Sequence, residues 1–203
     1  MDALGIDQAG IVGHDVGAYV GQALGRTAPG RLTGLFFFNC PYPGIGRRWA
    51  APEHLTEIWY QSFNQKPFAA EVVGASRAAC AAYIGHFLRH WAGRPDAFDD
   101  VFEQFVDNFL KDGNLQGGFN WYVSSNPGRL ATIREEVPAM PPITVRTCIR
   151  WGDQDPLIPY AWTDQLSAYF ADLDLARFPA GHFPHREDPA RAAAEIKRFF
   201  AAR

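Results

Sequence analysis

A sharp turn between a strand and a helix is the feature that most constrains how this chain can fold. Residues 11–17, Ile-Val-Gly-His-Asp-Val-Gly, lead from β-branched residues into the pattern Gly-x-Asp-x-Gly, and small residues follow. Glycine on either side leaves room for a tight turn and for an apex residue in a strained conformation. The apex is Asp15, whose carboxylate is ionised at neutral pH because its reference pKa lies near 3.9. The turn is either an ordinary link between two elements or a device that presents a nucleophile.

The composition is that of a soluble globular protein with a sizeable core. The 203 residues are 47% hydrophobic and 20% charged, which suits one domain. The net charge of −3 and the lack of a lysine or arginine run argue against nucleic acid or an anionic membrane as partner. No apolar stretch approaches the ~18 residues of a membrane span. Widely spaced cysteines without a signal peptide indicate reduced thiols in a cytoplasmic protein; they are Cys40, Cys80 and Cys148.

The order of the predicted elements indicates an α/β fold. Apolar runs alternate with helical periodicities, and glycine or proline separates them. The run Leu35-Phe36-Phe37-Phe38 is continuously apolar, which is typical of a parallel strand buried on both faces. The predicted strands are residues 11–13, 32–39, 143–150 and 175–178; the predicted helices are residues 17–28, 160–171 and 188–201, and residues 1–7 have the pattern of a helix end.

The middle of the chain differs because it contains helical patterns and no convincing strand. Pro138, Pro141 and Pro142 mark its end. We therefore predict an α/β core of residues 1–44 and 141–203, with a mostly parallel sheet, interrupted by a helical cap, or lid, at residues 45–140. The predicted cap helices are residues 53–63, 69–91 and 97–110.

Two loops downstream of the turn carry residues that complement Asp15. Asp155 follows the predicted strand 143–150, and His182 follows the strand 175–178. The carboxyl ends of parallel strands meet at one edge of a sheet, where such folds place their sites. A carboxylate, a second acid and a histidine supply a nucleophile, an orienting group and a general base. We therefore predict a catalytic set of Asp15, Asp155 and His182.

These segments together resemble the α/β-hydrolase superfamily and, within it, the epoxide hydrolases. The resemblance spans essentially the whole chain, and the order nucleophile, acid, histidine is the one that the superfamily has. It implies that Asp15 is the nucleophile, that Asp155 orients His182, and that the backbone N–H of Val16 provides half of an oxyanion hole. The matching segments are the elbow at residues 13–17, Asn39-Cys40-Pro41, the acid loop at residues 151–155 and Gly181-His182-Phe183.

Two aromatic segments of the predicted cap resemble the tyrosine segments of epoxide hydrolases. Trp59-Tyr60-Gln61-x-Phe63, followed by Gln65-Lys66-Pro67, resembles the first, and Phe119-Asn120-Trp121-Tyr122 resembles the second. Without the resemblance, aromatic residues at helical spacing indicate core packing. The resemblance implies that Tyr60 and Tyr122 hydrogen-bond the epoxide oxygen.

The implied reaction converts a small apolar epoxide and water into a vicinal diol. Asp15 attacks carbon to form an ester, and a tyrosine, with a reference pKa near 10, donates to the departing alkoxide. His182 then takes a proton from the water that hydrolyses the ester. This chemistry needs no metal or organic cofactor, and the sequence shows no cluster of metal ligands.

A dehalogenase acting on haloalkanes or haloacetates, with the same Asp-His-Asp set, is the alternative. Haloalkane dehalogenases commonly have Trp after the nucleophile, and fluoroacetate dehalogenases have Arg there, whereas this chain has Val16. Epoxide hydrolases also often have Trp at that position. Val123 is a further departure, because the second tyrosine segment of that family usually ends in Arg.

The front of the superfamily's fold has no counterpart in this sequence. Four strands normally precede the elbow, and an early His-Gly-x-Pro loop supplies the other half of the oxyanion hole. The elbow strand is therefore expected at an uncovered apolar edge, where a second chain can pair to give a homodimer. Two hypotheses follow: a hydrolase whose sequence is truncated, or a catalytically impaired binding or assembly module. The catalytic set and the two tyrosines favour the first.

Overall fold

The computed structural model describes residues 1–202, which form two compact units. The core unit comprises residues 1–45 and the chain from residue 138 onward, and the helical unit comprises residues 46–137. The chain enters and leaves the helical unit once, so the core unit is discontinuous in sequence. Within the described part of the chain, no helix has the length and apolar character that crossing a membrane requires.

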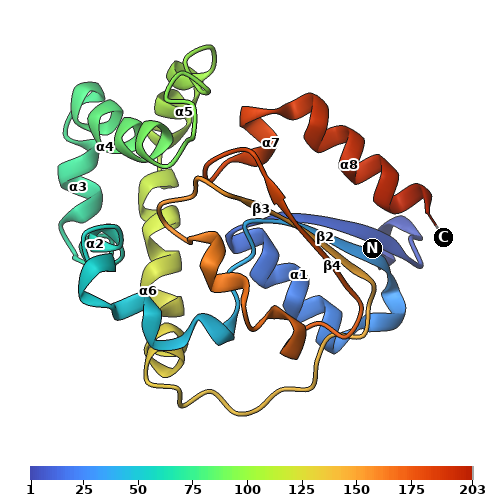
Figure 1. Ribbon diagram of the computed structural model, residues 1–203. Coiled ribbons are helices and arrows are strands. Elements are labelled where there is room, and N and C mark those ends of the chain that lie inside the picture. The colour runs from blue at the N-terminus through green and yellow to red at the C-terminus, as the bar shows by residue number, and fades with distance from the viewer. Residues whose placement is uncertain (203) are drawn as a thin grey trace. The chain divides into compact units, whose positions relative to one another are not determined.

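A four-stranded parallel sheet forms the centre of the core unit (Figure 1). Neighbouring strands pair in the order β1-β2-β3-β4, so their carboxyl ends lie at one edge. This confirms the predicted α/β fold. The strands are β1 (Ala9–His14), β2 (Leu32–Phe38), β3 (Thr147–Gly152) and β4 (Leu173–Phe178); the helices are α1 (Val16–Thr27), α7 (Pro184–Glu187) and α8 (Pro189–Ala201); 3-10 turns lie at Asp2–Leu4, Pro29–Arg31, Tyr160–Thr163 and Leu166–Ala168.

Alternating side chains of β2 explain why helices cover both faces of this sheet. Phe36 packs in a buried cluster with Phe199 of α8, and their ring centroids are 5.8 Å apart. Phe37 points to the opposite face, where α1 approaches so closely that a Cβ on Gly21 would lie 2.5 Å from its ring. Both faces of β2 are therefore buried, which accounts for the continuous apolar run in its sequence.

The helix predicted for residues 160–171 is wrong, because the structure has two separate 3-10 turns there. The hydroxyl of Tyr42 lies between the turns. It donates to the carbonyl of Trp162 at 2.6 Å and accepts from the backbone N–H of Gln165 at 3.2 Å. A side chain inserted among backbone groups in this way replaces helical hydrogen bonds, so a continuous helix does not form.

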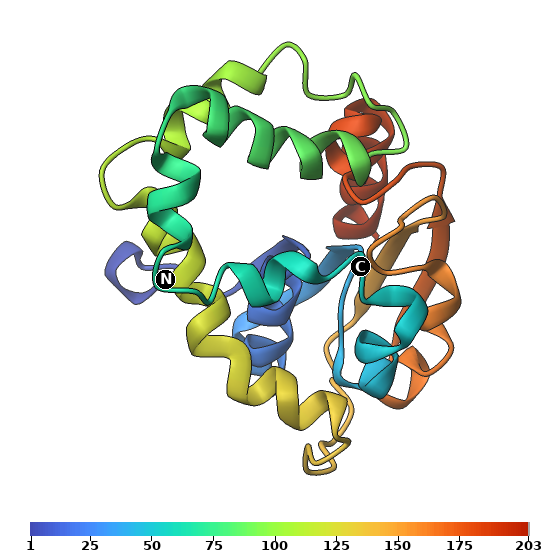
Figure 2. The same ribbon diagram turned by 90° about the vertical axis from the view of Figure 1, so that its left-hand side faces the viewer.

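Helices and 3-10 turns build the helical unit, without a strand among its residues 46–137 (Figure 2). The helix predicted for residues 69–91 is instead two helices, α3 and α4. Ser76 starts the second, since its hydroxyl accepts from the N–H of Ala79 at 3.1 Å and caps the new helix. The helices are α2 (Trp59–Phe63), α3 (Ala69–Gly74), α4 (Arg77–His90), α5 (Phe102–Phe109) and α6 (Asn114–Ile133), with a 3-10 turn at Pro52–His54. A 3-10 segment at Pro43–Ala50, kinked at Gly46, leads from the core unit into the helical unit.

Candidate active site

Asp15 lies at the apex between β1 and α1, in a conformation that residues other than glycine rarely adopt. Its φ is 47° and its ψ is −112°. Gly13 is required beside it, because a Cβ there would lie 2.7 Å from the carbonyl oxygen of Gly17. Gly17 itself is not crowded, since its Cβ would meet open space. The turn therefore depends on glycine before the apex and on backbone strain at Asp15.

The Asp15 carboxylate is poorly solvated. Loss of hydration raises the pKa of this carboxyl, and the charge of Asp155 adds to the rise. The charge of His182 and a hydrogen bond from the backbone N–H of Val16 lower the same pKa and so oppose the shift. Exchanging water for fixed protein groups around a charged nucleophile favours its reaction, so this environment suits covalent catalysis.

The predicted acid and base are hydrogen-bonded to each other. Nδ1 of His182 lies 2.8 Å from Oδ2 of Asp155, and both residues are buried. The other carboxylate oxygen, Oδ1, accepts from the backbone N–H of Leu157 at 2.8 Å and of Ile158 at 3.1 Å. An ionised carboxylate only accepts, so His182 donates through Nδ1 and its Nε2 is the atom that can act as a base.

The surroundings of His182 favour its charged form. Burial lowers the pKa of His182, but the charge of Asp155 and the hydrogen bond to it raise this pKa, as do the charges of Asp15 and Glu187. The net shift of the pKa is upward. An imidazole that removes a proton from water becomes an imidazolium, and these carboxylates stabilise that product.

Asn39 joins the loops of the acid and the base, and its role was not predicted from the sequence. Its side-chain amide donates to Oδ2 of Asp155 and, at 3.3 Å, to the carbonyl of Gly181. Its side-chain oxygen accepts from the backbone N–H of Gly152 at 3.0 Å. The signals in the sequence are a polar residue directly after an apolar strand and the resemblance of Asn39-Cys40-Pro41 to the superfamily. The structure shows this residue fully buried, with a φ of 41°.

The acid and base loops are also in direct backbone contact. A Cβ on Gly152 would lie 1.9 Å from the carbonyl oxygen of Gly181, a distance that only glycine permits. The backbone N–H of Gln154 donates to the carbonyl of Ala180 at 3.0 Å. The two loops therefore form one block that holds Asp155 and His182 together.

His14, the residue before the apex, links the elbow to the base loop. Its Nε2 lies 2.7 Å from the carbonyl oxygen of His182, so this nitrogen carries a proton and donates it. Burial lowers the pKa of His14 well below its ordinary value, and the charges of His182 and His185 lower it further. His14 is therefore a neutral donor. Its position beside Asp15 is the only indication of this role in the sequence.

The two predicted cap tyrosines are neighbours within the helical unit. Tyr60 of α2 and Tyr122 of α6 have ring centroids 5.6 Å apart, with their planes at 90°. Tyr60 is buried, and its hydroxyl accepts from the side-chain amide of Gln61 at 3.3 Å. Two sequence segments that lie far apart along the chain therefore bring their tyrosines together.

The cysteines do not add a nucleophile to this site. Burial raises the pKa of the Cys40 thiol well above its ordinary value and raises that of Cys148 to about 12, so both are protonated at neutral pH. Cys80 is also buried, and none of the three forms a disulfide. In residues 1–202, no group of three or more histidine, cysteine, aspartate or glutamate side chains is arranged to hold a metal ion.

Comparison with known proteins identifies the family. The model of the alpha/beta hydrolase family matches residues 1–195. No curated protein matches this chain. Many solved structures share the fold, and they include proteins described as epoxide hydrolases and as an acyltransferase.

Three of these structures illustrate the similarity. The epoxide hydrolase CorEH has a TM-score of 0.79 at 19% identity, over 98% of this chain and 70% of that one. A structure of epoxide hydrolases from metagenomes of hot environments has a TM-score of 0.75 at 20% identity, and the match covers 100% of this chain and 70% of that one. A Salmonella enterica protein described as an acyltransferase has a TM-score of 0.85 at 18% identity, and the match covers 100% of this chain and 67% of that one. This chain thus spans about two thirds of each structure, and identities this low establish the fold alone.

Proposed function

Because the chain belongs to the α/β-hydrolase family, we propose that it opens an epoxide to a vicinal diol through a covalent ester on Asp15. One observation carries this proposal: the apex of the strained elbow is a carboxylate, and a buried Asp155–His182 pair lies close enough for its charges to shift the pKa of Asp15. An ionised carboxylate needs no base before it attacks carbon, whereas a serine nucleophile does. Structures named as epoxide hydrolases share this fold, so the fold is compatible with the proposed substrate class.

The first step forms the ester. A carboxylate oxygen of Asp15 attacks an epoxide carbon from behind, the carbon–oxygen bond of the ring breaks, and its electron pair goes to the oxygen. A strongly basic alkoxide results unless an acid meets it. We propose Tyr60 and Tyr122 for that role because their segments resemble the tyrosine segments of epoxide hydrolases and their rings are neighbours within the helical unit.

The second step frees the enzyme. His182 takes a proton from water as the water oxygen attacks the ester carbonyl of Asp15, and the bond between that carbonyl carbon and the diol oxygen breaks. The departing diol oxygen takes the proton from His182, and the carboxyl of Asp15 loses its proton to the acid used in the first step, which restores the free enzyme. The backbone N–H of Val16 hydrogen-bonds the free carboxylate. In the ester, this N–H can donate to the carbonyl oxygen, which gains negative charge when water attacks. Esterification also neutralises Asp15 and so removes one charge that raises the pKa of His182. The neutral imidazole therefore becomes more abundant when it is needed.

The test uses a styrene-type epoxide and two variants. We expect diol release by the wild type, none by Asp15→Ala, and trapping of the ester by His182→Gln, detected as added mass on Asp15. Equal diol release by the wild type and Asp15→Ala would refute the proposal. Halide release from a haloalkane or haloacetate, without diol formation, would assign the site to a dehalogenase instead.

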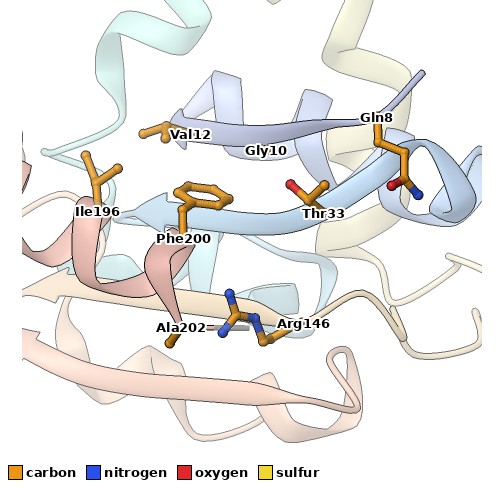
Figure 3. Close-up of a pocket in the computed structure, with 8 residues that line it drawn as sticks. All are labelled: Gln8, Gly10, Val12, Thr33, Arg146, Ile196, Phe200 and Ala202. Atoms are coloured by element: carbon orange, nitrogen blue, oxygen red, sulfur yellow. The ribbon is translucent and has the colours of Figure 1, made fainter. Parts of the chain in front are cut away.

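A second copy of this chain is our proposed partner for the edge strand β1. Val12 on this strand is 49% exposed, and the groove between β1 and α8 has a volume of about 930 Å³ (Figure 3). An uncovered edge beside apolar side chains favours pairing of two identical strands. Sedimentation should show a dimer that Val12→Lys dissociates, and a monomer at all concentrations would contradict the pairing. The groove is lined by Gln8, Gly10, Val12, Thr33, Arg146, Ile196, Phe200 and Ala202.

A further inference from the structure

Glu187 holds the backbone on both sides of the base. Its Oε2 accepts from the backbone N–H of Gly181 at 3.0 Å, and its Oε1 accepts from the backbone N–H of Phe183 at 3.1 Å. Glu187 is 7% exposed, although it carries a charged side chain. Acidic side chains are rarely buried unless they are paired, and these two bonds from the loop at residues 181–183 satisfy the buried carboxylate of Glu187.

The local fold explains how the side chain reaches both amides. Pro184 begins the single turn α7, and Glu187 is its last residue. The backbone N–H of Glu187 bonds the carbonyl of Phe183 at 2.9 Å, which closes the turn. The turn folds the side chain back over the residues that precede it. One carboxylate thereby binds the backbone N–H groups of the residues before and after His182.

We propose that Glu187 is a positioning residue for His182 in ester hydrolysis, an inference that rests on the proposed function. The backbone N–H groups of the residues before and after His182 are both bound by Glu187, which restrains the backbone from which the imidazole extends toward Asp155. His14 adds a third hydrogen bond to this backbone, because its Nε2 donates to the carbonyl of His182 at 2.7 Å. The imidazole is therefore positioned by bonds to the backbone of residues 181–183 as well as by Asp155.

The requirement is for a carboxylate and not simply for a polar side chain of this size. Each oxygen of Glu187 accepts one N–H, so both ends of the group must be acceptors. A glutamine at this position has one oxygen and one NH₂ group. Its NH₂ group would face an N–H donor, so Glu187→Gln should release one side of the base while keeping the volume of the side chain.

The first experiment separates the two chemical steps in single turnovers with a styrene-type epoxide. In Glu187→Gln we expect ester formation at a rate close to that of the wild type and ester hydrolysis slower by ~10-fold or more, because small errors in the position of a base are costly. The ester should accumulate as added mass on Asp15, as in His182→Gln. The matched control is Asp188→Asn, the next carboxylate, whose Oδ1 accepts from Arg191 N–H at 3.0 Å and caps α8.

The second experiment needs no substrate. A proton shared between Nδ1 of His182 and Asp155 should give a far-downfield resonance in the ¹H NMR spectrum. We expect this resonance to broaden or shift in Glu187→Gln and to stay unchanged in Asp188→Asn. If Glu187→Gln does not fold, Glu187→Asp, which keeps the charge but shortens the reach, carries the same comparison.

The outcomes discriminate between the two proposals. An unchanged resonance together with unchanged ester hydrolysis would overturn the role of Glu187, as would an equal loss of both chemical steps. If neither the wild type nor His182→Gln forms an ester, the proposed function has failed. The resonance then decides the role of Glu187 by itself.

Discussion

The two halves of the candidate active site are held in place by different means. The half that holds the proposed nucleophile is defined by its backbone: Asp15 has a φ of 47°, and Gly13 permits the close approach of the chain. The acid–base half is a network of side chains and loops. Asn39 bonds to both loops of that half, and Asp155 accepts from three other parts of the chain.

The difference shows what each half tolerates. A position defined by backbone geometry does not depend on which side chain it carries, as long as its neighbours leave room. A position defined by side-chain hydrogen bonds fails when one partner is removed, because the others are left buried without a partner. Substitutions that act on one half and spare the other therefore test this contrast.

Gly152→Ala should have the largest effect, since it forces the two loops of the acid–base half apart. The new Cβ would lie 1.9 Å from the carbonyl oxygen of Gly181, and backbone cannot yield without moving His182. We expect a loss of about 3 kcal/mol or more in the free energy of unfolding, measured with denaturant. A variant with the stability of the wild type would show that the loops are not one block.

Asn39→Ala should have the next largest effect. It removes a donor from Asp155 and leaves the buried backbone N–H of Gly152 without its partner. The free energy of unfolding should fall by about 1–3 kcal/mol. Ester hydrolysis should slow while ester formation persists, because Asp15 has no bond to Asn39. Equal slowing of both steps in single-turnover kinetics would argue against the separation of the two halves.

The pH dependence should reveal the charge environment of His182. The charge of Asp155 and the hydrogen bond to it raise the pKa of His182, also when the ester has removed the charge of Asp15. Only the neutral imidazole acts as a base, so ester hydrolysis should increase with pH. Asp155→Asn removes the main carboxylate that raises this pKa, so its midpoint should shift to lower pH. A midpoint that does not move between the two proteins would contradict the assignment.

Gly17→Ala should have the smallest effect. The new Cβ meets open space in the first turn of α1, and alanine favours a helix by up to about 1 kcal/mol. Gly13→Ala is the matched comparison and should destabilise the fold, because its Cβ would lie 2.7 Å from the carbonyl oxygen of Gly17. Thermal unfolding should show the first variant equal to or above the wild type and the second clearly below it. The reverse order would show that the strain lies elsewhere.

The elbow could be predicted from the sequence more fully than the acid–base half. The elbow is encoded in seven consecutive residues, so its turn and its apex were predictable, as was the parallel sheet around the apolar run of β2. The support of the acid–base half was not predictable. Asn39 and Asp155 are separated by 116 positions, and no local pattern indicates that they meet. The broken helix near Tyr42 was missed for the same reason, because its cause is a distant side chain.

The strained apex has a consequence for how such a site can change over evolutionary time. Since the conformation at residue 15 comes from its neighbours and not from the carboxylate, the proposed reacting group at this position can be exchanged without rebuilding the scaffold. The acid and the base offer no such freedom, because each is bound into a block with shared partners. New reactions should therefore arise at the apex, while the machinery that serves it stays constant.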